Sequence, residues 1–272
     1  MKYLLIFLCF FVMLLSSYFT STHIISNAYA TMNEKLNFET FETEKVASVE
    51  EKEIKKWHNK SPKYVYLTFD DGPSKNTAEI LDILNDYDAP STFFLLGNNI
   101  KSNSKSEELL NSILDQGHYI GLHSMTHQNK KLYTHANAAQ NFVDEMLQVQ
   151  DLVFDYTDGF ETSLIRAPYG ATPGKFSEQH IKKTVDAGLK LWDWNVDSVD
   201  WNSDAKEVIH NVKKYTKQNA DKEHLIVLFH EKDSTVEALP TVIEYYQSLG
   251  YEIVPYNPNQ HVVMNYVKSD DL

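Results

Sequence analysis

Residues 64–74 read YVYLTFDDGPS, and they indicate the class of fold. The first six are apolar, aromatic or β-branched, which is typical of a strand buried on both faces. The run ends at two adjacent carboxylates, Asp70 and Asp71, and a Gly-Pro pair follows. Such an ending is either a turn in front of a helix cap or the edge of a site that uses both carboxylates.

The same alternation of a strand-like run and a helix-like stretch continues along the chain. The expected strands lie at 64–69, 91–97, 118–124, 164–168, 190–196, 225–231 and 251–256. The expected helices lie near 76–87, 105–115, 136–154, 177–187, 204–218 and 235–248. About seven βα units in about 200 residues predict an α/β fold whose parallel strands close into a barrel. A doubly wound open sheet is the alternative architecture.

Polar side chains follow the ends of the expected strands. They are Asp70, Asp71, His123, Arg166, Asp197, Asp200 and His230. Because the carboxyl ends of the strands in a βα barrel meet at one face, these groups are expected to share one pocket.

The segment HSMTH, residues 123–127, contains candidate metal ligands. His123 and His127 are spaced i and i+4, so both imidazoles can reach one ion. With Asp70 or Asp71 they form a two-histidine, one-carboxylate set that leaves positions open for water and substrate. This set favours Zn²⁺, and Co²⁺, Ni²⁺ or Mn²⁺ also fit it. The second carboxylate is then free to take a proton from water. An incidental histidine pair in a polar loop is the alternative.

His230 lies at the end of an expected strand and is a candidate general acid. Asp200 or Asp197 can orient the second nitrogen of its ring. A histidine at the edge of the core that only bonds to the backbone is the alternative.

The segment RAPYG, residues 166–170, offers a charge and a constrained loop. Arg166 needs a carboxylate partner at a strand end, because an unpaired buried charge is costly. Pro168 and Gly170 restrict the loop, so that a backbone N–H such as that of Tyr169 can point at a developing oxyanion.

Five segments, in this order, resemble the motifs of the NodB-homology polysaccharide deacetylases, carbohydrate esterase family 4. They are TFDDGPS (68–74), HSMTH (123–127), RAPYG (166–170), DSVDW (197–201) and LFH (228–230). The resemblance implies a distorted (β/α) barrel of seven or so parallel strands. It also implies metal-dependent removal of acetyl groups from N-acetylated sugars.

The resemblance further implies a role for each motif residue. Asp70 would be the general base, positioned by Arg166. His230 would be the general acid, oriented by Asp200. The remaining assignments are Asp71, His123 and His127 as metal ligands, the Tyr169 N–H as oxyanion donor, and Trp201, Leu228, Pro168 and Tyr169 as residues that contact the substrate.

The first thirty residues have the composition of a secretory signal, with Lys2, a long uncharged apolar run and an Ala28-Tyr29-Ala30 cleavage site. This predicts a signal peptide at 1–30, a linker or solvated segment at 31–61, a catalytic domain at 62–258 and a C-terminal tail at 259–272. An uncleaved signal would instead anchor the protein in the membrane.

The single cysteine, Cys9, lies inside the signal, so the mature chain would have no disulfide. Export without disulfides is typical of Gram-positive bacteria. We therefore expect a protein that is secreted or associated with the cell wall.

The net charge of −13 argues against nucleic acid and anionic lipid as partners. An exported protein with this resemblance is expected to act on peptidoglycan, at N-acetylglucosamine. Alternative substrates are N-acetylmuramic acid, chitin oligomers, poly-N-acetylglucosamine and O-acetylated xylan. An inactive carbohydrate-binding relative would lack the base or a metal ligand, whereas Asp70, Asp71, His123 and His127 are all present. A metalloprotease would carry His-Glu-x-x-His, and HSMTH lacks the Glu.

Overall fold

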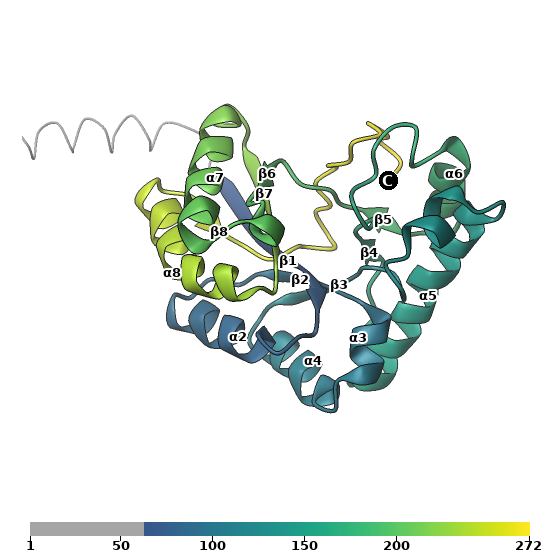
Figure 1. Cartoon of the computed structure of the whole chain (residues 1–272), viewed down its shortest axis with the longest axis horizontal. Helices are drawn as coiled ribbons and strands as arrows, with labels where there is room; N and C mark the ends of the chain where they lie inside the picture. The colour runs from purple at the N-terminus through teal and green to yellow at the C-terminus, as the bar shows by residue number, and fades with distance from the viewer. Residues whose placement is uncertain (1–62) are drawn as a thin grey trace, which may run out of the picture. The chain divides into compact units, whose positions relative to one another are not determined.

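The computed structural model describes residues 63–272, in which seven parallel strands curl into a half-barrel (Figure 1). The strands pair in the order β5-β4-β3-β2-β1-β7-β6, and the short β8 pairs with the start of β1. They are β1 (Tyr64–Gly72), β2 (Thr92–Leu95), β3 (Tyr119–Leu122), β4 (Leu164–Ile165), β5 (Lys190–Leu191), β6 (Val196–Asp197), β7 (His224–His230) and β8 (Glu252–Ile253). The predicted α/β fold with a distorted barrel of parallel strands is confirmed.

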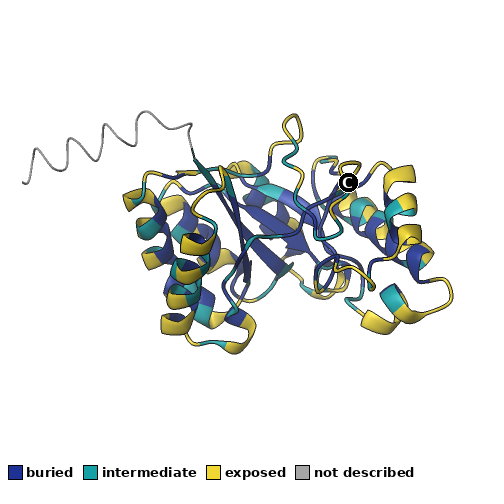
Figure 2. Cartoon of the chain, turned by 90° about the horizontal axis from the view of Figure 1, so that it is seen from above, coloured by how far each residue is buried: buried dark blue, intermediate teal, exposed yellow. Residues whose placement is uncertain are grey.

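Helices cover the outer face of the curled sheet and turn their buried sides toward it (Figure 2). They are α2 (Thr77–Asp86), α3 (Gly97–Ser102), α4 (Ser106–Asp115), α5 (Ala138–Tyr156), α6 (Glu178–Asp186), α7 (Ala205–Gln218) and α8 (Asp233–Ser248), with a π-helical turn η1 (Lys130–Thr134) and a 3₁₀ turn η2 (Asp200–Asn202). Each of the six predicted helices forms. The short α3 was not predicted, because six residues are too few to show the apolar periodicity of a helix.

The single strand predicted for residues 190–196 is wrong. Lys190–Leu191 pair with β4 at one edge of the sheet, whereas Val196–Asp197 pair with β7 at the other edge. The chain crosses between the two edges at 192–195. The buried Asp193 carboxylate accepts the backbone N–H groups of Ala171 and Tyr266, at 3.1 and 2.8 Å, and so ties this crossing to two other segments.

Strand β1 has one face in the hydrophobic core and the other face toward the inside of the half-barrel. Val65, Leu67 and Phe69 belong to the outer core between sheet and helices. Tyr66 belongs to a second apolar cluster on the inner face, with Trp192 among its members. Since side chains alternate along a strand, Asp70 lies on the same inner face as Tyr66, at the carboxyl end. The inner face therefore has an apolar floor and a polar mouth.

Candidate active site and metal centre

Strand register brings the predicted polar residues together at the mouth of the half-barrel. Asp70 on β1 is paired directly with His230 on β7. Leu122 on β3 is paired with Ile165 on β4, and His123 and Arg166 are the residues that directly follow them. Asp70, Asp71, His123, His127 and His230 line one pocket of about 470 Å³, together with Tyr169, Trp194, Asp197, Trp201, Leu228 and Lys232.

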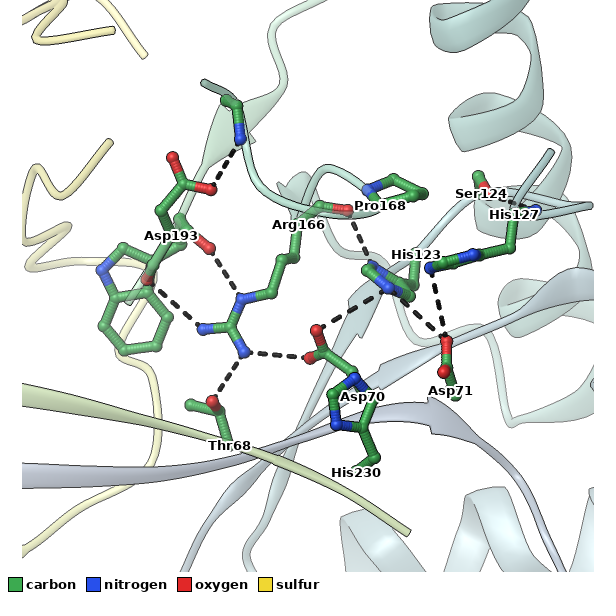
Figure 3. Close-up of polar contacts among 12 residues, drawn as sticks. Thr68, Asp70, Asp71, His123, Ser124, His127, Arg166, Pro168, Asp193 and His230 are labelled. Carbon is green, nitrogen blue, oxygen red and sulfur yellow. Dashed lines mark hydrogen bonds and ion pairs between the residues drawn. The ribbon is translucent and has the colours of Figure 1, made fainter. Parts of the chain in front are cut away.

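The end of β1 turns two neighbouring carboxylates to the same side. Adjacent strand residues normally point to opposite faces. Here the register shifts between Asp70 and Gly72, and Asp71 adopts a left-handed backbone with φ of 68°. Asn99 holds this conformation by donating its Nδ2–H to the Asp71 carbonyl at 2.7 Å. Both carboxylates therefore reach the pocket (Figure 3).

Asp71, His123 and His127 form a cluster suited to a metal ion. Their ligand atoms all lie within 4.8 Å of one another. The Nε2 atoms of His123 and His127 are 3.6 and 3.7 Å from Asp71 Oδ1. That oxygen is buried and has no hydrogen-bond partner among residues 63–272. A buried carboxylate oxygen without a donor is costly unless a cation compensates it, so the donor set fits a divalent metal.

His123 is oriented by a backbone carbonyl. Its Nδ1 lies 2.9 Å from the Arg166 carbonyl oxygen, which can only accept, so Nδ1 carries the proton. The Nε2 lone pair is left free and faces Asp71. This arrangement is typical of a histidine that ligates a metal.

His127 is held in its neutral form. Burial lowers the pKa of its imidazole to about 4, against the opposing effect of Asp71 and Asp70. Its backbone N–H donates to Ser124 Oγ at 3.0 Å. A neutral imidazole is the state that a metal ion requires.

Arg166 is completely buried and places a fixed charge against Asp70. Its Nη1 donates to Asp70 Oδ1 at 2.9 Å and to Thr68 Oγ1 at 2.6 Å. Its Nε and Nη2 donate to the carbonyl oxygens of Trp192 and Asp193, at 2.9 and 3.4 Å. The guanidinium is thus fixed from several sides, and the Asp70 carboxylate is held with it (Figure 3).

His230 is paired with Asp200. Its Nδ1 lies 2.7 Å from Asp200 Oδ1, and its backbone N–H donates to Oδ2 at 2.5 Å. Burial alone would lower the pKa of His230, but the hydrogen bond and charge of Asp200, with Asp70 and Asp71, raise it to about 9. Asp197, the other predicted partner, instead bonds to Trp194 Nε1 and to the Val199 N–H.

The predicted substrate-contacting residues differ in position. Trp201 and Tyr169 line the pocket and are 63% and 51% exposed, whereas Leu228 lines it at 4% exposure. Pro168 is not among the lining residues; its carbonyl accepts a hydrogen bond from the Tyr133 hydroxyl. The lining of the pocket thus includes one buried apolar side chain, Leu228, and two exposed aromatic side chains.

Comparison with known proteins places the chain in a family. The profile of one family, described as polysaccharide deacetylase, matches residues 58–192. A peptidoglycan-N-acetylglucosamine deacetylase of Bacillus cereus is 36% identical over 219 residues, which are 78% of this chain and 76% of that protein. The chain belongs to the polysaccharide deacetylase family.

Solved structures of this deacetylase family agree in fold. The crystal structure of a polysaccharide deacetylase from Bacillus cereus has 35% sequence identity and a TM-score of 0.69, and the match covers 77% of this chain and all of that one (100%). A family 4 pseudoenzyme from Bacillus anthracis is 25% identical with a TM-score of 0.61, over 72% of this chain and 64% of its own. Membership in the deacetylase family therefore includes both enzymes and inactive relatives.

Two buried carboxylates that support the candidate site were not predicted. Glu145 on α5 accepts from the Thr126 N–H and hydroxyl, each at 2.9 Å, inside the HSMTH segment. Glu231 accepts from the Ser74 N–H at 2.9 Å, behind the first motif. Glu145 lies on the buried stripe of its helix, and a charged residue on an apolar stripe is the signal that could have identified it.

The predicted signal peptide and linker lie outside the described residues. None of the helices between 63 and 272 is both long and apolar enough to cross a membrane.

Proposed function

We propose that this protein is a metal-dependent N-deacetylase that removes acetyl groups from N-acetylglucosamine in peptidoglycan. One observation carries the proposal: the Asp71–His123–His127 cluster shares its pocket with a buried carboxylate, Asp70, and a carboxylate-paired histidine, His230. Amide hydrolysis needs an activated water, positive charge near the oxyanion and an acid for the departing nitrogen. The pocket offers a group for each need.

Asp71, His123 and His127 would hold the metal, and Zn²⁺ suits two imidazoles and one carboxylate. Co²⁺, Ni²⁺ and Mn²⁺ accept the same donors. A divalent ion at this position supplies charge that polarises an acyl carbonyl and acidifies water.

Asp70 acts as the general base. Its Oδ1 is held by Arg166, and its Oδ2 lies 3.7 Å from His123 Nε2, on the side of the ligand cluster. This oxygen is placed to accept a proton from the attacking water. The fixed guanidinium keeps the carboxylate from turning away as it does so.

His230 acts as the general acid. With its pKa raised to about 9, the imidazole carries a proton at neutral pH. Asp200 holds Nδ1, so Nε2 is the nitrogen that can deliver a proton to the departing amine. The Tyr169 N–H donates to the oxyanion that forms when water attacks, before the amine departs.

The substrate is argued from the shape of the pocket and from the relatives. A volume of about 470 Å³ accommodates a sugar ring with its acetyl group. Trp201 and Tyr169 are exposed aromatic residues that line the pocket, where aromatic side chains can contact a sugar. The Bacillus cereus relative with 36% identity is a peptidoglycan deacetylase. We further propose that the protein is exported to the wall in a Gram-positive cell, where this substrate is found.

Acetate release tests the proposal. The protein is incubated with peptidoglycan, chitin oligomers, poly-N-acetylglucosamine and acetylated xylan, with chelator and with added Zn²⁺. We expect release from peptidoglycan that chelator abolishes and Zn²⁺ restores. Preference for another glycan would reassign the substrate, and release that resists chelation would contradict the mechanism.

A matched pair of variants tests the base. Asp70→Asn should lower kcat by about 10²–10⁴-fold, the usual contribution of a general base. Asp82→Asn removes an exposed carboxylate on α2 and should leave kcat unchanged. Glycan binding without acetate release from any substrate would show an inactive relative instead.

A further inference from the structure

The loop that carries Tyr169 contains a β-turn, and the middle peptide of a β-turn can take two opposite orientations. The Gly170 N–H donates to the Ala167 carbonyl at 2.8 Å, which closes a four-residue β-turn. Pro168 occupies its second position, where the ring requires a negative φ. Tyr169 occupies the third position with φ of 65°. A proline followed by a positive φ identifies a type II turn.

In a type II turn the middle peptide is rotated by about 180° relative to type I. The middle peptide here joins Pro168 to Tyr169. Since a trans peptide is planar, its C=O and N–H point in opposite directions. One orientation presents the Tyr169 N–H to the pocket, and the other would present a carbonyl oxygen, which repels an oxyanion. An L-residue such as tyrosine rarely adopts a positive φ, so the type II form needs support from outside the turn.

Tyr133 supplies that support. It lies in η1 and donates its hydroxyl to the Pro168 carbonyl at 2.8 Å, across a separation of 35 residues. The Tyr169 N–H, on the opposite edge of the same peptide, donates to no acceptor among residues 63–272. Burial raises the pKa of Tyr133 well above its usual value, so its hydroxyl remains a donor.

A cation holds the two tyrosines together. The Lys175 ammonium lies 4.5 Å from the Tyr133 ring centroid and 4.2 Å from that of Tyr169. The Tyr169 hydroxyl donates to the His127 carbonyl at 3.0 Å, and the two rings are 4.4 Å apart. The turn is therefore fastened both at its peptide and at its side chain, next to a candidate metal ligand.

We propose that Tyr133 is a positioning residue for deacetylation, which holds the Pro168–Tyr169 peptide in the orientation that presents the Tyr169 N–H to the acyl oxygen. The inference rests on the proposed function, since it assumes an acyl oxygen in the pocket. It adds a residue that lies outside the five sequence motifs.

The kinetic test compares Tyr133→Phe with Tyr87→Phe, which removes a hydroxyl bonded to Glu244 on the exposed surface. We expect Tyr133→Phe to lower kcat by about 10- to 100-fold, up to the loss seen when an oxyanion donor is deleted. KM, bound metal and the thermal midpoint should match those of Tyr87→Phe. An unchanged kcat would overturn the proposal. Loss of metal or of stability would also overturn it, because Tyr133 would then support only the fold of the loop.

A second comparison uses glycine at the turn. Tyr169→Gly favours the type II form on its own, because glycine accepts a positive φ without strain. The kcat cost of Tyr133→Phe should fall below about threefold in the Tyr169→Gly background, as residues acting on one peptide are not additive. An equal cost in both backgrounds would overturn the proposal.

A measurement without turnover separates this inference from the proposed function. The Tyr169 amide signal of protein labelled with ¹⁵N-tyrosine is recorded for the native chain and both phenylalanine variants. We expect a large shift in Tyr133→Phe and none in Tyr87→Phe. If the signal shifts but no glycan releases acetate, the turn is as inferred and the proposed function fails. If the signal does not move, the inference fails whatever the activity.

Discussion

On one side of the pocket a histidine is kept neutral, and on the other a histidine is kept protonated. His127 belongs to the proposed ligand cluster, here called the metal side, and its pKa is lowered to about 4. His230 is the proposed general acid, on what is here called the acid side, and its pKa is raised to about 9. Burial lowers the pKa of both. The difference lies in the carboxylate partner: Asp71 Oδ1 is 3.7 Å from His127 Nε2, whereas Asp200 Oδ1 is 2.7 Å from His230 Nδ1.

This comparison teaches how one residue type can serve the two tasks proposed for it in one pocket. A carboxylate beyond hydrogen-bond distance leaves room for an ion and leaves the imidazole free to ligate it. A carboxylate in hydrogen-bond contact stabilises the imidazolium and orients its other nitrogen. The metal side and the acid side can therefore be disrupted separately.

The largest effect is expected on the metal side. His123→Ala removes a ligand, and the metal contributes several kcal/mol to transition-state stabilisation, so acetate release should fall by at least about 10³-fold. Bound metal, measured by mass spectrometry, should be lost with it. His210→Ala, on the exposed face of α7, is the control. Native metal content in His123→Ala would remove this residue from the ligand set.

On the acid side, Asp200→Asn should lower kcat by about 10²-fold. His230 must be protonated to act, so activity falls as pH rises through its pKa. Losing the Asp200 charge lowers that pKa, and the basic limb of the pH profile should move to lower pH. Asp197→Asn should leave the limb in place, because Asp197 bonds to Trp194 and Val199 instead. A shift in that variant and none in Asp200→Asn would reverse the assignment.

A smaller effect should separate metal affinity from catalysis. Glu145→Gln weakens the bonds that hold Thr126, next to His127, and should reduce metal affinity by about 10-fold, as supporting residues typically do. At saturating metal kcat should recover, which it should not for Asp200→Asn. The control is Asp144→Asn, an exposed neighbour on the same helix. Unchanged affinity in competition with a chelating dye would limit Glu145 to a role in folding.

The smallest effect concerns Trp201, which follows Asp200 on the acid side. Trp201→Ala should raise KM roughly fivefold through the loss of one ring-stacking contact, with little change in kcat. Phe154→Ala removes another exposed aromatic ring, which does not line this pocket, and should change neither constant. A fall in kcat without a change in KM would place Trp201 among the groups that act in the transition state.

Much of the site could be predicted, because its residues directly follow strands. Asp70, His123, Arg166 and His230 each come after or at the end of an apolar run, and parallel strands end at one face. The order of the motifs then indicated the family, which comparison with known proteins supports. The division of residues 190–196 between two edges was missed, because an apolar run has the same pattern whether one strand or two use it.

Local patterns of apolar and polar residues were enough for the alternation of strands and helices, the parallel sheet and the types of ligand at its mouth. Those properties depend on neighbours in the chain. Those patterns left Asp197 and Asp200 open as partners of His230, and only the family resemblance named Asp200. Folding alone settled how Asp71 turns into the pocket and that Tyr133 reaches Pro168. Each of these is a hydrogen bond or a backbone rotation set by residues distant in the chain, so it cannot be predicted from any short segment of the sequence.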